Sequence, residues 1–270
     1  MPAAYGVAFE VLGTTVEVET PNEETTKAVA GLLPAYASPR RATATECWRI
    51  SDREGAWSIE GYRAPPDTFT SRDEALDALE YLIVLRLLHH ADRIAHVHAS
   101  GAVRNGEAML ALGNSGAGKT SIAFHWSLSG LPVLSDDVVF VDHEAAALPF
   151  KRLFSVDPRQ FHAAGLEPDR TPQIGIGDEH MWFDPASHGR WGDRAPVGTL
   201  AFIRYDSSTE LSIEPLPTPE ALSLLLASVM DSGLSPEAAI DRLANVVKRA
   251  RTVRVTFNDS AVAAAALAET

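Results

Sequence analysis

The chain has 270 residues, of which 46% are hydrophobic, and it carries a formal net charge of −13. This length suits one large or two modest domains, and the hydrophobic content is sufficient for a core. The acidic balance, with no clustered basic stripe, argues against a protein that binds a nucleic-acid backbone and would suit a basic peptide partner.

The single cysteine, Cys47, excludes an internal disulfide and a cysteine-based metal cluster, as is typical of a reducing cytoplasm. The first residues lack the basic and then apolar pattern of a signal peptide. Residues 81–88 are apolar but too short and too charged to span a bilayer. We therefore expect a cytoplasmic protein without membrane contact. No pattern fixes the oligomeric state, so a homo-oligomer stays open.

Residues 1–92 are expected to form a small α+β domain, because strand-like pairs alternate with helix-like runs. A capping-box pattern at 71–74 begins the second of these helices. Strand pairs are expected at residues 6–19 and 46–60, and helices at residues 22–33 and 71–90. Such a domain would hold a peptide substrate or cover one edge of the catalytic sheet.

The second expected domain, residues 93–270, begins with a hairpin. Asn105-Gly106 is the strongest hairpin signal in the chain, and it separates two apolar runs that are typical of strands. His96 and His98 differ by two positions and therefore share a face of the first strand. The hairpin brings His98 back toward the glycine-rich segment at residues 113–120. His98 could therefore be catalytic, or it could have the ordinary structural role of a histidine on a strand.

The most informative motif is a complete G-x-x-x-x-G-K-[ST] phosphate-binding loop at residues 113–120. A buried strand is expected before it and a helix after it, at 121–129, which is the context that this loop requires. Backbone N–H groups and the helix N-terminus would hold phosphate oxygens, Lys119 would reach the β- and γ-phosphates, and the Thr120 hydroxyl would hold Mg²⁺. The sequence therefore predicts a site for a nucleoside triphosphate, expected to be ATP, with Mg²⁺. The expected nucleotide-binding residues are Gly113, Asn114, Ser115, Gly116, Ala117, Gly118, Lys119, Thr120 and Ser121.

Two adjacent carboxylates, Asp136 and Asp137, follow an apolar run that begins at Leu131. The interval from Lys119 leaves room for one helix and one return strand, which would place both acids beside the loop in a parallel βαβ arrangement. Phosphoryl transfer needs a carboxylate that holds Mg²⁺ and another that takes a proton from the attacking hydroxyl. The structural alternative is an Asp-Asp turn before a hairpin.

The order of these motifs, continuous from His98 to Asp142, resembles the catalytic domain of HPr kinase/phosphorylase. That domain belongs to a wider group that shares its phosphate loop with phosphoenolpyruvate carboxykinases. A weaker similarity to this family follows at residues 200–205 and 211–222. The resemblance implies an α/β fold, in which a P-loop catalytic domain with a mixed sheet follows the small α+β N-terminal domain.

The resemblance also implies a role for each site residue. His98 and Asp136 would activate the acceptor hydroxyl, while Asp137 and Thr120 would be the metal ligands. Lys119 and the loop amides would grip the phosphates and take part in transfer.

Two features depart from the HPr kinase pattern. Ser121 follows Lys119-Thr120 where those kinases have a glutamate, and the nearest counterpart of their E-x-R-G-x-G segment, residues 173–180, lacks the arginine. The resemblance therefore points away from HPr as the substrate and from phosphorylase activity. It points to relatives of similar length that phosphorylate other hydroxyls, including kinases that modify a serine of lasso-type peptides.

The remaining segments are less informative. Lys151 and Arg152 are expected in a loop, where they could brace phosphate, receive an acidic substrate or simply be solvated. Residues 175–192 have the composition of a mobile active-site flap or of a plain connection. Helices are expected from Thr218 and Ser235 as N-caps, followed by a strand and a helix at 252–257 and 260–268.

Three functions fit these observations. The first is an ATP-dependent kinase that phosphorylates a hydroxyl, with a serine of a peptide or protein as the favoured acceptor. The second is a small-molecule kinase acting on a hydroxyl metabolite, although in such enzymes the acids usually run into a helix, whereas here residues 138–141 continue as strand. The third is a non-catalytic ATP-sensing module, which would need a metal ligand but no base.

Overall fold

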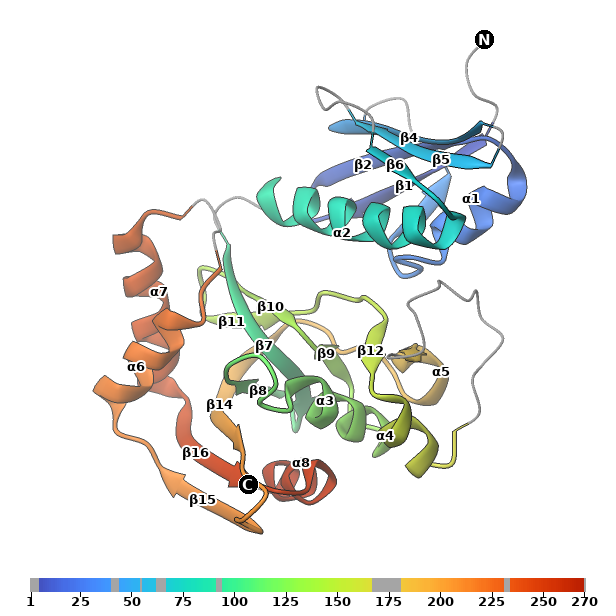
Figure 1. Cartoon of the computed structure of the whole chain (residues 1–270). Coiled ribbons are helices and arrows are strands. Elements are labelled where there is room, and N and C mark those ends of the chain that lie inside the picture. Colours follow the sequence, from blue (N-terminus) through green and yellow to red (C-terminus); the bar gives the residue numbers. More distant parts are fainter. Residues whose placement is uncertain are drawn as a thin grey trace. The chain divides into compact units, whose positions relative to one another are not determined.

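The computed structural model of the chain describes residues 5–39, 44–53, 55–61, 67–90, 94–166, 181–230 and 234–269. These residues form a mixed α/β protein with two main mixed sheets, one of six strands and one of eight (Figure 1). The chain divides into two compact units. The first comprises residues 1–91 and 157–182, and the second comprises residues 92–156 and 183–270.

The first unit contains the six-stranded sheet, in the order β3-β1-β2-β4-β5-β6. Its strands are β1 (Tyr5–Val11), β2 (Thr14–Thr20), β3 (Ala37–Pro39), β4 (Glu46–Arg53), β5 (Ala56–Gly61) and β6 (Asp67–Phe69). Its helices are α1 (Glu23–Ala30), α2 (Arg72–His90) and α4 (Pro158–Ala163). The two predicted strand pairs are confirmed, because β1 pairs with β2 and β4 with β5, both antiparallel.

Local side chains set the starts of the long helices in this unit. The Asn22 Oδ1 accepts a hydrogen bond from the Thr25 N–H at 2.8 Å, so it caps α1. The Ser71 Oγ accepts from the Glu74 N–H, and the Glu74 carboxylate accepts from the Thr70 N–H, which confirms a capping arrangement at the start of α2.

The second unit contains the eight-stranded sheet, in the order β11-β10-β7-β8-β14-β16-β15, with β9 paired to β7. Its strands are β7 (Ala95–Arg104), β8 (Glu107–Leu112), β9 (Val133–Ser135), β10 (Val138–Val141), β11 (Ala146–Leu148), β14 (Ala195–Tyr205), β15 (Leu211–Pro215) and β16 (Arg251–Phe257). Its helices are α3 (Lys119–Leu128), α5 (Pro185–His188), α6 (Thr218–Ala227), α7 (Pro236–Arg249) and α8 (Ser260–Glu269). The short strands β12 (Phe154–Val156) and β13 (Met181–Phe183) lie outside this sheet.

Strand direction in this sheet brings several carboxyl ends to one edge. β8 is parallel to β14, and β14 is parallel to β16. β7 is antiparallel both to β8 and to β9, so β8 and β9 run in the same direction. The predicted parallel βαβ arrangement of β8, α3 and β9 is therefore present in direction, but β7 lies between the two strands. The hairpin at Asn105-Gly106 pairs one edge of β7 with β8, and β9 pairs with the other edge of β7.

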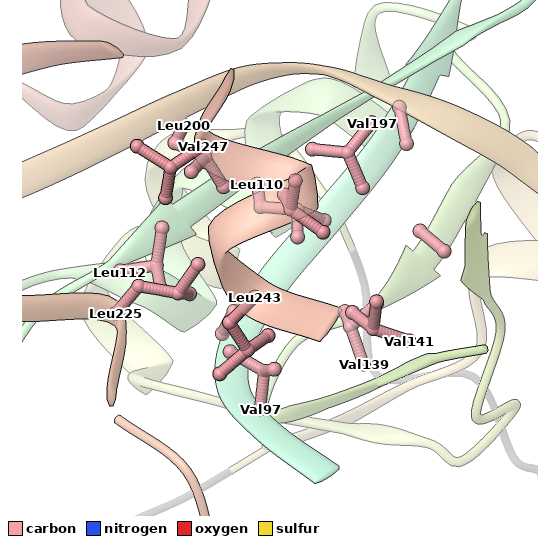
Figure 2. Packing of buried hydrophobic residues seen from close by; sticks show 14 of the residues in the cluster. Val97, Leu110, Leu112, Val139, Val141, Val197, Leu200, Leu225, Leu243 and Val247 are labelled. Atoms are coloured by element: carbon pink, nitrogen blue, oxygen red, sulfur yellow. The ribbon is translucent and has the colours of Figure 1, made fainter. Parts of the chain in front are cut away.

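Helices cover both sides of the eight-stranded sheet, with α6 and α7 on one side and α3 and α8 on the other (Figure 1). The α6–α7 side has a continuous buried cluster, in which Leu225 of α6 and Leu243 and Val247 of α7 pack against Val97, Leu110 and other strand residues (Figure 2). On the other side α3 packs on β7, β8 and β9, and α8 packs on α3. The carboxyl ends of β8 and β9 are thus held between two packed layers.

The C-terminal predictions are confirmed for every element and for one of two caps. Ser235 caps α7, since its Oγ accepts a hydrogen bond from the Ala238 N–H. The cap predicted at Thr218 is wrong, because the N-cap of α6 is Pro217, which offers no side-chain hydrogen bond. With Pro217 extended and Pro219 fixed in the first turn, the helix begins at Thr218 itself.

Some sequence predictions fall on undescribed residues. The segment 173–180 lies outside the described residues, and so does the first part of the expected flap at 175–192. The described part of that flap forms β13 and the short helix α5. No described helix is long and apolar enough to cross a membrane.

Candidate active site

The strand that carries His98 reaches the site through the predicted hairpin. Asn105 and Gly106 have φ angles of 52° and 84°, the left-handed pair that a two-residue hairpin turn needs. Arg104 pairs with Glu107 across this turn, and His98 pairs with Val138 of β10 on the other side of β7. His98 therefore lies beside the strand that follows the two acids.

The predicted phosphate loop joins β8 to α3 in the expected strand–loop–helix context. Gly116 and Gly118 have φ angles of 77° and 97°, which residues with a Cβ rarely adopt. The crest of the loop, residues 114–116, is exposed to solvent. Gly118 is the N-cap of α3 and provides no side-chain hydrogen bond to the first turn. The first N–H groups of α3 and the curled loop can therefore bind an anion.

Gly113 sets the height of the loop above the sheet. A Cβ at this position would lie 2.7 Å from the Ile203 backbone oxygen and 2.8 Å from the Ala117 Cβ. Because a backbone atom cannot move as cheaply as a flexible side chain, only glycine allows this approach.

Replacing Gly113 with alanine is therefore expected to destabilise the protein by about 1–3 kcal/mol through overpacking and to weaken nucleotide binding by shifting the loop. Urea unfolding and calorimetry would measure the two effects. Gly130→Ala is the control, because a Cβ at Gly130 meets nothing within 4 Å, so this variant adds only the backbone strain of a φ of 83°. It should lose only about 1–2 kcal/mol and keep nucleotide affinity. Unchanged nucleotide affinity in Gly113→Ala would contradict the role of this close approach.

Lys119 starts α3 and is buried, with 6% of its surface exposed. Its Nζ donates hydrogen bonds to the backbone oxygens of Gly113 at 2.8 Å and Asn114 at 3.1 Å. Burial lowers the pKa of Lys119, while the nearby carboxylates of Asp137 and Asp136 act in the opposite direction. The ammonium group is thus held inside the loop and close to the paired acids.

The two acids lie at a bend between β9 and β10. Ser135 shapes this bend, because its Oγ accepts hydrogen bonds from the N–H groups of Asp137 at 3.3 Å and Val138 at 3.2 Å. β10 then continues along β7, which confirms the strand expected at 138–141. The bend gives the two carboxylates different neighbours although they are adjacent in the sequence.

Asp136 points to the phosphate loop. Thr120 Oγ1 donates a hydrogen bond to Asp136 Oδ2 at 3.3 Å. Asp136 is 5% exposed, and its Oδ1 is buried without a hydrogen-bond partner among the described residues. Burial raises the pKa of Asp136 to about 7, in spite of the opposing charge of Arg152.

Asp137 is more exposed than Asp136 and contacts a histidine and an arginine. His98 Nδ1 donates to Asp137 Oδ1 at 3.0 Å, since a carboxylate can only accept, and Arg152 Nη1 lies 3.5 Å from Asp137 Oδ2. The hydrogen bond from His98 is the largest cause that lowers the pKa of Asp137, and Arg152 adds to it. Asp137 is therefore an ionised carboxylate, and 39% of its side-chain surface is exposed to solvent.

These contacts join the predicted residues in a different combination from the one that the resemblance implies. His98 was expected with Asp136, but it contacts Asp137; Thr120 was expected with Asp137, but it contacts Asp136. The bend at Ser135 is the cause, because it turns the first acid toward α3 and the second toward β7. Sequence reasoning also missed the place of Arg152, for which only a loop position was expected. Its spacing from Asp137 contains no signal of contact.

No protein-family model matches this sequence, and a comparison with curated proteins gives no match.

Proposed function

We propose that the chain is an ATP-dependent kinase of the HPr kinase/phosphoenolpyruvate carboxykinase-like P-loop type, which transfers the γ-phosphoryl group to a hydroxyl, with a serine of a peptide or protein as the favoured acceptor. One observation carries the proposal. Beside a phosphate loop, one carboxylate contacts the loop hydroxyl of Thr120 and its neighbour contacts a histidine. A module that only binds nucleotide needs a carboxylate beside Thr120 to hold a metal ion. It does not need a second carboxylate in contact with a histidine.

The donor set around Thr120 fits Mg²⁺. A hydroxyl and a buried carboxylate, one oxygen of which has no hydrogen-bond partner among the residues that the structure describes, are hard oxygen ligands, which Mg²⁺ prefers. We assign Thr120 and Asp136 to this ion, which would neutralise charge on the β- and γ-phosphates when bound. Asp136 suits this role better than Asp137, because Asp136 contacts Thr120 and is too deeply buried to contact an acceptor hydroxyl.

The other acid suits proton transfer. In this proposal the ionised Asp137 takes the proton of the acceptor hydroxyl, and the hydroxyl oxygen forms a bond to the γ-phosphorus. The bond between that phosphorus and the oxygen bridging to the β-phosphate breaks, so ADP leaves. His98 orients Asp137, and Lys119 and the loop N–H groups stabilise the negative charge of the phosphoryl oxygens.

The direct test is incubation with γ-labelled ATP and three classes of acceptor, namely serine-containing peptides, free serine and sugars. Mass spectrometry should show a peptide heavier by one phosphoryl group. Labelled free serine or sugar without labelled peptide would favour a metabolite kinase. Binding of MgATP without transfer to any acceptor class would favour a sensor.

Lys119→Ala is expected to weaken MgATP binding roughly 10- to 100-fold, because a charged hydrogen bond to phosphate is lost, and to reduce transfer as well. Calorimetry and the labelled-ATP assay would measure the two effects. Lys248→Ala removes an exposed lysine on α7 and should change neither. Equal MgATP affinity in the Lys119 variant and the unchanged protein would show that the loop is not the nucleotide site.

A further inference from the structure

The phosphate loop lies over the carboxyl ends of two strands that the proposed function does not use. Gly113 approaches Ile203 of β14, and a Cβ on Gly118 would lie 3.0 Å from the Phe257 ring at the end of β16. Both strands are parallel to β8, so their last residues lie at the same edge of the sheet as the loop.

Tyr205 is the last residue of β14, and 53% of its surface is exposed. It lies two positions after Ile203, so on the strand it faces the same side as the residue that Gly113 contacts. It is also in register with Phe257, and the centroids of the two rings are 6.2 Å apart in a T-shaped contact. Phe257, which is fully buried, therefore restricts the ring of Tyr205 next to the loop.

We propose that Tyr205 is the stacking platform for the heteroaromatic base of the nucleotide whose phosphates the loop holds. Because this inference rests on the proposed function, it concerns the same ligand but a separate part of it. The base lies beyond the α-phosphate, on the side away from the transferred group. Asp136, Asp137 and His98 all lie toward β7, on one side of the loop. The base would therefore lie on the other side, toward the ends of β14 and β16.

The chemistry of Tyr205 matches this ligand class. An aromatic side chain with a solvent-exposed surface can stack on a base, and such a contact requires no particular hydrogen-bond pattern. Tyr205 is restrained by Phe257 in the protein, so little ring motion would be lost on stacking.

The test compares MgATP with magnesium tripolyphosphate, which has the phosphates but no base. Calorimetry on Tyr205→Ala should show MgATP affinity reduced about 5- to 100-fold and tripolyphosphate affinity unchanged. Tyr205→Phe keeps the ring and should keep MgATP affinity. Tyr81→Ala is the matched control, because Tyr81 is 61% exposed but lies on α2 in the other unit, and it should change neither affinity.

The outcomes separate this inference from the proposed function. If Tyr205→Ala binds MgATP as the unchanged protein does, or loses affinity equally for both ligands, the stacking role is overturned while the phosphate site stands. If the unchanged protein binds neither ligand, both the stacking role and the proposed function fail. Should the alanine variant not fold, Tyr205→Leu keeps an apolar side chain at the strand end without a ring and gives the same comparison.

Discussion

Asp137→Asn is expected to reduce phosphoryl transfer by about 10²–10⁴-fold and to leave MgATP affinity near that of the unchanged protein. The amide has almost the same shape as the carboxylate, so the bend and the neighbours of the site should persist. It cannot take a proton from the acceptor hydroxyl, and it weakens the contacts with His98 and Arg152. Single-turnover transfer from labelled ATP and calorimetry would measure the two quantities.

The control for this variant is Asp241→Asn, which changes an exposed acid on α7 and should leave transfer unchanged. His98→Ala should lose less transfer than Asp137→Asn, because the proton acceptor remains and only its orientation is disturbed. Normal turnover in Asp137→Asn, together with a collapse in Asp136→Asn at unchanged Mg²⁺ dependence, would restore the roles that the family resemblance implies.

Asp136→Asn is expected to remove the response to Mg²⁺. In the proposed function the Asp136 carboxylate is a ligand of Mg²⁺, so its loss should lower MgATP affinity by about 10- to 100-fold. ATP without Mg²⁺ should bind the variant and the unchanged protein alike. Calorimetry should show that Mg²⁺ raises the ATP affinity of the unchanged protein but not that of the variant.

The same variant should change the pH dependence of stability in the absence of metal. Burial raises the pKa of Asp136 to about 7, whereas in an unfolded chain an aspartate titrates near about 3.9. Between these values the folded state binds more protons than the unfolded state, so the contribution of Asp136 to the free energy of unfolding decreases as pH rises from about 4 through 7. Asparagine does not titrate.

Thermal unfolding of both proteins at pH 5 and pH 8 isolates this effect, because every other acid is common to the two. Asp136→Asn should gain stability relative to the unchanged protein at pH 8, and the gain should be smaller at pH 5. A gain of the same size at both pH values would mean that Asp136 is not a buried carboxyl with a raised pKa.

Much of the local structure of the site could be predicted because the signals lie within short segments. The hairpin at Asn105-Gly106 and the loop at 113–120 depend on residues that adopt positive φ angles, and neighbouring residues specify their conformations. The interval between Lys119 and Asp136 was also informative, because it fits one helix and one strand.

The wider arrangement could not be predicted in the same way. The position of β7 between β8 and β9 follows from pairing between distant strands, which a local pattern does not specify. The partners of Asp136 and Asp137 depend on a bend produced by the Ser135 hydroxyl, a single side chain with no motif of its own. The contact of Arg152 with Asp137 depends on the path of a loop in three dimensions.

The support of the phosphate loop by later parts of the chain has a consequence for biosynthesis. Gly118 lies against Phe257, and the Trp126 indole N–H donates a buried hydrogen bond to the Ala264 carbonyl of α8 at 3.0 Å. A nascent chain on the ribosome that has not yet extended past these residues therefore has the phosphate loop without the residues of β16 and α8 that support it. If the loop binds nucleotide as proposed, ribosome-bound intermediates stalled before residue 250 should fail to retain it, and binding should begin only late in translation.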